Sequence, residues 1–171
     1  MDWWLIILRV VHVGGAMAWF GGALVGGFFL MPAAKALGPA SQQFMDHLMR
    51  RRRMGVYFPI VAALTIFSGA ALYWRVSNGL ASAWISSPTG LAYTIGGLAA
   101  IVAFVGGMIL IGPGAAEQTA VRNELAASGG TPSDAQRGRL ERADRRMQLA
   151  SRIDLPLLLL AGLTMAVGRY L

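Results

Sequence analysis

Four apolar stretches separated by charged residues constrain this sequence more than any other feature. No Asp, Glu, Lys or Arg occurs in residues 10–34, 57–74, 76–116 or 155–168. A helix needs about 20 residues to cross the roughly 30 Å hydrocarbon core of a bilayer. We therefore predict an all-α, four-helix transmembrane bundle that forms one membrane domain over residues 1–171, with spans at about 5–31, 57–75, 89–112 and 152–170.

The first and the fourth apolar stretch can each be interpreted in two ways. The first stretch is longer than the roughly 7–15 apolar residues of a secretory signal, so we expect it to be a retained span. In the fourth, Asp154 before Pro156 is typical of a helix start, because proline fits the first turn and a carboxylate favours the positive helix end. Alternatively, residues 147–151 belong to the same helix. We interpret Asp154 as a cap, or as an ion-pair partner of Arg152 or Arg53.

The composition excludes several classes of protein. Only 13% of the residues are charged, whereas a soluble domain has about 25%. The sequence contains no cysteine, which rules out disulfide scaffolds, cysteine nucleophiles, thiolate zinc sites and iron–sulfur clusters. It also has no G-x-S-x-G, H-E-x-x-H or Walker motif. Hydrolytic chemistry is therefore not indicated, and whether the chain is an enzyme stays open.

The basic residues predict the orientation in the membrane. Five of them lie in residues 35–53 and seven in residues 122–152, whereas the remaining loop and the two ends carry only Arg9, Arg75 and Arg169. Positive charge is retained on the cytoplasmic side, so both termini are predicted to lie outside. This asymmetry explains the net charge of +7 without nucleic acid, for which no groove-reading motif is present. Six aromatic residues fall at the predicted outer interface: Trp3, Trp4, Tyr73, Trp74, Trp84 and Tyr170.

The two segments between spans on the cytoplasmic side, 32–56 and 113–151, are predicted to be helical as well. Ser41 to Arg53 place apolar and polar side chains on opposite faces, which is typical of an amphipathic helix in the headgroup layer. Residues 115–152 are typical of a polar helical hairpin. Its turn is predicted at Ser128-Gly129-Gly130, and Thr131 to Asp134 have the spacing of a capped helix start.

His12 is the strongest candidate for a functional residue. It belongs to a helical stripe of the first span that also contains small residues, which allow close approach of a helix or a flat ligand; the stripe comprises Arg9, His12, Gly15, Trp19, Gly22, Gly26 and Phe29. An ionisable side chain at membrane depth is by default a functional-site hypothesis. Neutral imidazole ligates haem iron or copper. The alternative is a structural histidine satisfied by a neighbouring hydroxyl or carbonyl.

The residues near His12 are compatible with either haem or copper(I) at this site. Arg9, one turn away, either binds a haem propionate, a lipid phosphate or a quinone oxygen, or extends to the interface. The only other histidine, His47, is predicted on the opposite side of the membrane. A second axial haem ligand would then be Met17 or Met108, although methionine is also common filler in apolar bundles. Copper(I) would use the same histidine and methionine residues.

Several short motifs resemble the CopD-like superfamily. The first span of this superfamily has the pattern "LHV…W.GG", which is similar to His12-Val13 followed by Trp19-Phe20-Gly21-Gly22. The second span of the HemJ type has an arginine-rich entry, which Arg50 to Arg53 before Pro59 resemble. The last span of that type is resembled by Asp154-Leu155-Pro156. The superfamily includes copper-resistance CopD proteins, HemJ-type protoporphyrinogen oxidases and uncharacterised four-span families. The resemblance implies a compact four-helix bundle in a bacterial inner membrane, with His12 as haem or metal ligand.

The HemJ type carries His-x-Lys at the start of its third span, whereas residues 89–93 contain neither residue; the uncharacterised branch is therefore the closest fit. We expect a small membrane protein that binds haem b, or contributes a histidine to an electron-transfer assembly, through His12, with Arg9 and Trp19 lining the pocket and Met108 as a candidate second ligand. Two alternatives are a non-catalytic accessory subunit and CopD-like copper uptake or tolerance. The expected partners are the lipid bilayer and either other membrane proteins or copies of this chain.

Overall fold

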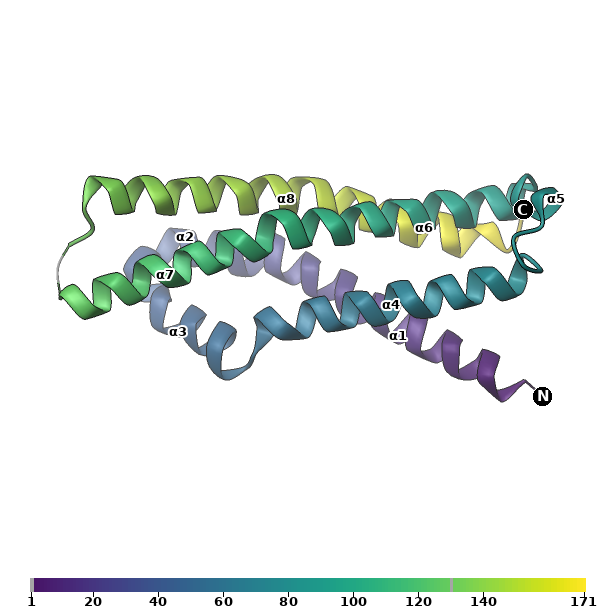
Figure 1. Cartoon of the computed structure of the whole chain (residues 1–171), viewed down its shortest axis with the longest axis horizontal. Helices are drawn as coiled ribbons and strands as arrows, with labels where there is room; N and C mark the ends of the chain where they lie inside the picture. Colours follow the sequence, from purple (N-terminus) through teal and green to yellow (C-terminus); the bar gives the residue numbers. More distant parts are fainter. Residues whose placement is uncertain (1, 130) are drawn as a thin grey trace.

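The computed structural model describes residues 2–129 and 131–171, and its regular elements are all helical (Figure 1). In chain order they are α1 (Trp3–Val25), η1 (Gly26–Leu30), α2 (Met31–Leu37), η2 (Gly38–Ser41), α3 (Gln42–Asp46), η3 (His47–Arg51), α4 (Met54–Val76), α5 (Ser82–Ile85), α6 (Pro88–Gly106), η4 (Gly107–Ile111), α7 (Gly112–Ser128) and α8 (Asp134–Gly168). The predicted all-α bundle is confirmed.

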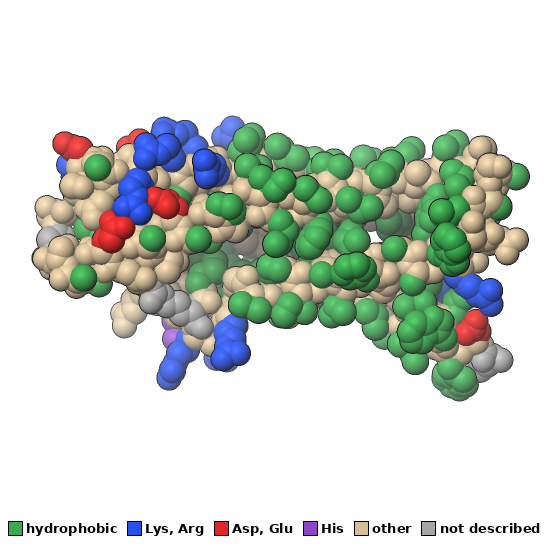
Figure 2. Space-filling model, in the orientation of Figure 1, with side chains coloured by type: hydrophobic (Ala, Val, Ile, Leu, Met, Phe, Trp, Pro, Cys, Tyr) green, Lys and Arg blue, Asp and Glu red, His purple; other side chains and the backbone are tan. Residues whose placement is uncertain are grey.

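Four of the helical runs are long and apolar enough to cross a membrane: Trp3–Leu37, Met54–Val76, Pro88–Ser128 and Asp134–Gly168. The chain is therefore a multi-pass membrane protein. Both termini lie at one end of the bundle, and the α7–α8 turn lies at the other (Figure 1). We call this second end the basic end, because lysine and arginine side chains gather there (Figure 2).

The predicted start of the last span is wrong in one respect. Asp154 does not cap a helix, because α8 continues without interruption from Asp134 through Pro156 to Gly168. The predicted alternative, in which residues 147–151 belong to the same helix, is the observed one. Likewise, α7 continues the third span, so the two arms of the polar hairpin extend from spans three and four.

Two π-helical segments let the first and third spans continue past a proline. η1 and η4 both begin in a glycine pair, and each precedes a helix with proline in its first turn, Pro32 in α2 and Pro113 in α7. Proline lacks a backbone N–H, and its ring clashes with the carbonyl four residues earlier. A π turn accommodates one extra residue, which moves that carbonyl away from the ring. The helices therefore continue toward the basic end.

The helices pack mainly in two pairs, α1 with α4 and α6 with α8. The contacts involve small residues: a Cβ atom on Gly15 would lie 2.5 Å from Thr65 Oγ1, and one on Gly96 would lie 2.6 Å from Thr164 Oγ1. The buried core between α6 and α8 contains Ala99, Ala100 and Ala161. Small interfacial residues are typical of membrane helices, whose larger apolar side chains face lipid. Figure 2 shows such side chains along the middle of the molecule.

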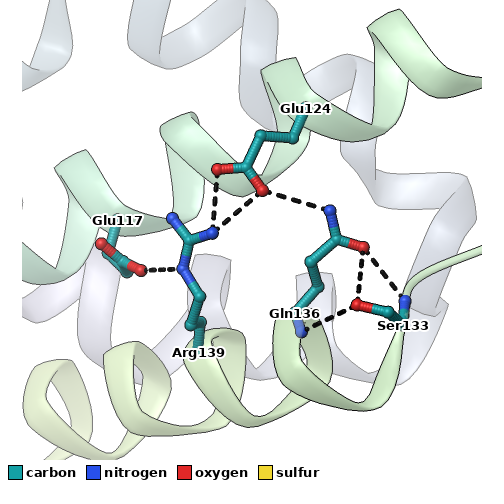
Figure 3. Close-up of polar contacts among 5 residues, drawn as sticks. All are labelled: Glu117, Glu124, Ser133, Gln136 and Arg139. Atoms are coloured by element: carbon teal, nitrogen blue, oxygen red, sulfur yellow. Dashed lines mark hydrogen bonds and ion pairs between the residues drawn. The ribbon is translucent and has the colours of Figure 1, made fainter.

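The α7–α8 hairpin is held by polar contacts (Figure 3). Ser133 and Gln136 form a capping box at the start of α8. The Arg139 guanidinium donates to Glu117 and, at 2.8 and 2.9 Å, to both oxygens of Glu124. The helical hairpin and its capped start are thus observed as predicted; Gly130, the last residue of the predicted turn, lies outside the described residues.

The predicted amphipathic helix at residues 41–53 is divided into two parts, α3 and the π-helical η3. It ends before Arg53, which has a left-handed φ of 53° and precedes α4. Arg122 in α7 donates to Asp46 Oδ1 at 2.8 Å, so this segment is attached to the hairpin.

Candidate functional site

His12 lies in the third turn of α1, where its ring rests on the backbone of α4. A Cβ atom on Gly69 would lie 2.7 Å from His12 Cε1 and 2.9 Å from Nδ1. Real Cβ atoms do not approach so closely, so only glycine at position 69 leaves room for the imidazole. The ring is half-buried in this position.

One hydrogen bond indicates which nitrogen of the His12 ring carries a hydrogen. Nδ1 lies 2.9 Å from the carbonyl oxygen of Thr65. A carbonyl can only accept, so Nδ1 carries the hydrogen, and in neutral imidazole Nε2 is then the nitrogen with the lone pair. Histidines that ligate metals are commonly held in this way, with the other ring nitrogen donating to a carbonyl or carboxylate. The predicted alternative, a structural histidine satisfied by a neighbouring carbonyl, makes the same bond.

The two hydroxyl groups around this bond are satisfied within α4. Thr65 Oγ1 donates to the Val61 carbonyl at 2.8 Å, and Ser68 Oγ donates to the Leu64 carbonyl at 2.6 Å. Such bonds to the preceding turn are common for hydroxyl side chains in apolar helices. Sequence reasoning missed Thr65, Ser68 and Gly69; the available signal was a cluster of two hydroxyl residues and a glycine within an otherwise apolar span.

Arg9 and Trp19 are placed at different distances from His12. Arg9 is exposed one turn before it on α1. Trp19 lies two turns beyond, and its ring makes an edge-on contact with Phe104 of α6, with centroids 6.3 Å apart. Arg9 is therefore close enough to contribute to a ligand site at His12, whereas Trp19 connects the two helix pairs.

The structure does not bring Met108 to His12. The Trp19–Phe104 contact marks a common depth of α1 and α6, and both helices run toward the basic end. His12 comes seven residues before Trp19, and Met108 four residues after Phe104. At about 1.5 Å of rise per residue, they are roughly 16 Å apart along the bundle. Met108 is half-exposed in η4, and His47 is exposed in η3.

Asp154 forms a second polar position, half-buried where α8 faces Gly106 and Gly107. Its Oδ1 atom is buried and has no hydrogen-bond partner among the described residues. A Cβ atom on Gly106 would lie 3.4 Å from Oδ1, and one on Gly107 would lie 3.6 Å from Oδ2. Among the side chains that the structure describes, Asp154 makes no ion pair, so the predicted pairing with Arg152 or Arg53 is not observed.

Two hollows on the surface lie away from His12. One is lined by Trp74, Arg75, Asn78 and Gly79, and the other by Pro113, Gly114, Glu117, Arg139, Arg142, Ala143 and Arg146. Within residues 2–129 and 131–171, no three His, Cys, Asp or Glu side chains gather into a metal-binding group. A ligand at His12 would therefore rely on this single side chain and the adjoining helix surfaces.

Comparison of the chain with protein-family models, curated proteins and solved structures finds no match. The resemblance to the CopD-like superfamily therefore stays a prediction from the quoted motifs.

Proposed function

We propose that this chain is a small redox subunit of a bacterial inner membrane, with both termini outside, and that it binds haem b through His12 Nε2. The single observation that carries the proposal is the 2.9 Å bond from His12 Nδ1 to the Thr65 carbonyl. It directs the lone pair of the neutral ring to Nε2, the atom that would ligate iron. Bound haem would supply one-electron transfer.

The surroundings of His12 support a planar ligand on the face of the bundle. Gly69 leaves room for the imidazole and fixes its position, which favours ligation by limiting the orientations of the ring. No residue of α1 is buried, so a ligand could reach the ring from outside the helix pair. Arg9, exposed one turn away, could pair with a propionate.

This chain would supply one haem ligand, because Met108 lies too deep and Met17 lies on the same helix as His12, five residues further along and about 140° around the helix axis. If a partner chain supplied a second strong ligand, low-spin iron would be expected, whereas His12 alone would favour high-spin iron.

The test is a visible spectrum of the protein expressed with added haem and purified in lipid nanodiscs. We expect a Soret band that His12→Ala abolishes and His47→Ala leaves unchanged, since His47 is exposed at the basic end. Gly69→Ala should lower haem occupancy by displacing the ring. A colourless protein, or an unchanged Soret band in His12→Ala, would overturn the proposal. Elemental analysis that found copper without iron would instead favour the copper alternative.

A second candidate, an accessory subunit that packs against partner helices, is favoured by glycines that the bundle does not use. A Cβ atom on Gly14, Gly21, Gly97 or Gly162 would meet nothing within 4 Å, so small residues that allow close helix approach lie on free surfaces. Gly14→Leu should then reduce the amount of co-purified partner, whereas Val13→Leu, at an exposed neighbour, should not. Retention of the assembly in His12→Ala together with loss in Gly14→Leu would favour this candidate.

A further inference from the structure

We propose that Asp154, seated against Gly106 and Gly107, is a proton-binding carboxyl group inside the membrane-spanning part of the bundle, and that it exchanges its proton with water at the basic end. The proposal is independent of any ligand at His12. It rests on the depth of the carboxyl group, the absence of partners among the described residues, and a hollow on the same helix seam.

Two facing helices place Asp154 within the apolar part of the molecule. Gly107, beside the carboxyl group, comes ten residues before Glu117, the first charged residue further along that helix. Gly27 lies at the same depth on the first span, because a Cβ atom on it would lie 2.9 Å from Leu155 Cδ1. Lys35 follows it eight residues later. At about 1.5 Å of rise per residue, these charges lie roughly 12–15 Å closer to the basic end.

An ionised carboxylate in this position lacks the contacts that would compensate for its lost hydration. Oδ1 is buried without a hydrogen-bond partner among the described residues, and burying an unpaired charge is costly. The elements packed against this part of α8 offer no titratable neighbour: η1 has none, and α6, η4 and α7 have none between Tyr93 and Glu117. On α8 itself, Arg152 is exposed.

The donor set at this position suits a proton better than a metal cation. Mg²⁺ and Ca²⁺ take about six to eight oxygen ligands, whereas the facing residues, Gly106 and Gly107, have no side chains. A proton needs only one carboxylate oxygen. Its uptake converts the carboxylate to a neutral carboxyl group; the proton comes from water, and nothing is oxidised or reduced.

A surface hollow on the α7–α8 seam lies between the carboxyl group and the basic end. It has a volume of about 270 Å³, and its lining includes Pro113, Gly114, Arg142, Ala143 and Arg146. Pro113 comes six residues after Gly107, and Arg146 eight residues before Asp154. The hollow therefore lies about two helical turns from the carboxyl group, toward the basic end.

The experiment is modification of the full-length protein in nanodiscs by dicyclohexylcarbodiimide, an apolar reagent that adds to protonated carboxyl groups, with adducts located by mass spectrometry. We expect an adduct at Asp154 that falls about tenfold per pH unit on the alkaline side of its titration, as one proton requires. Asp154→Asn should remove this adduct, and Asp134→Asn, at an exposed acid, should leave it unchanged.

A second measurement covers the case in which Asp154→Asn does not fold. Infrared spectra of the unsubstituted protein containing carbon-13-labelled aspartate should show a protonated carboxyl band at a pH where water-exposed acids are ionised. Only carboxylate bands, or no adduct at Asp154 at any pH, would overturn the proposal. Suppression of the adduct by sodium or potassium chloride, but not by choline chloride, would also overturn it, because a metal cation would then occupy the position.

Discussion

Gly15 and Gly69 allow α1 and α4 to approach so closely that side chains of one helix touch the other helix at a glycine. A Cβ atom on Gly15 would lie 2.5 Å from Thr65 Oγ1 and 3.6 Å from the Val61 carbonyl. Thr65 is buried and already bonded to the Val61 carbonyl, so its hydroxyl cannot move away freely. A larger residue at position 15 must therefore separate the helices or displace Thr65.

We predict that Gly15→Ala destabilises the protein by about 1–3 kcal/mol, the usual cost of overpacking a tight contact. The matched control is Gly14→Ala, on the same helix but with nothing within 4 Å of the added methyl; it should be neutral, or stabilising by up to about 1 kcal/mol through helix propensity. Thermal unfolding in one detergent compares them. Equal shifts in Tm would contradict the close contact at Gly15.

For the contact between His12 and α4, the sequence predicts the histidine but not the residues that it touches. His12 could be singled out because an ionisable group in an apolar helix is costly wherever it lies. Thr65 and Gly69 could not, because the period of a single helix does not reveal the register of its neighbour. Met108 was matched to His12 by residue type, whereas the position of each residue along its own span determines their separation.

Among the elements, α8 shows how a membrane helix tolerates a proline. Pro156 predicts a helix start in an isolated sequence, since a proline in a helix interior removes one hydrogen bond. In an apolar bundle, ending the helix would leave more backbone groups unsatisfied than continuing it. The helix therefore passes through Pro156, and its true start is the capping box at Ser133. That start could be predicted, because capping signals are local in sequence.

We predict that Ser133→Ala destabilises the hairpin by about 0.5–2 kcal/mol, the usual effect of losing an N-cap. Hydrogen exchange of the amides in the first turn of α8 should accelerate accordingly. Ser128→Ala is the control, because the Ser128 hydroxyl only bonds the Leu125 carbonyl of its own helix, at 3.3 Å. Similar acceleration in both variants would show that the capping box does not hold this end of α8.

The hairpin should also loosen in acid. Hydrogen bonds from Gln136, and then from Arg139, hold the pKa of the Glu124 carboxyl, which lies in the polar arm outside the apolar spans, below its ordinary value. A lowered pKa contributes stability that is fully present above the ordinary carboxyl pKa, about 4.3, and is lost as pH falls through the lowered value. Hydrogen exchange measured against pH should show this loss; Glu124→Gln should reduce it, and an identical profile in that variant would contradict the assignment.

At the scale of the whole molecule, the two helix pairs accommodate proline in the same two ways. α1 and α6 both lead into a π-helical segment followed by a proline, and α4 and α8 both contain an internal proline, Pro59 and Pro156. The number of spans could be predicted, because three of the apolar runs have the length that a bilayer requires, and the fourth, residues 155–168, reaches it once its helix extends beyond the uncharged part. How the spans pair could not, because small residues recur on all four.

The absence of cysteine makes the orientation directly testable. Ser86, which follows α5, and Ser128, the last residue of α7, are both exposed. The helix ends that carry them lie at opposite ends of the bundle (Figure 1), so Ser86→Cys and Ser128→Cys each place a single thiol at one end. With arginines retained in the cytoplasm, a membrane-impermeant maleimide should label Ser86→Cys in intact cells and Ser128→Cys only after the membrane is opened. The reverse pattern would invert the proposed orientation.

The lack of buried residues in α1 has a mechanical consequence. It is attached by contacts with α4 and α8 that bury none of its residues, by the Trp19–Phe104 contact with α6, and by the exposed pair of Asp2 with Arg75, 3.6 Å apart. In contrast, α6 and α8 enclose a buried core. A force applied to the amino terminus should peel α1 away before the α6–α8 pair yields. The chain would then unravel in two separate events, with the first helix as the weaker one.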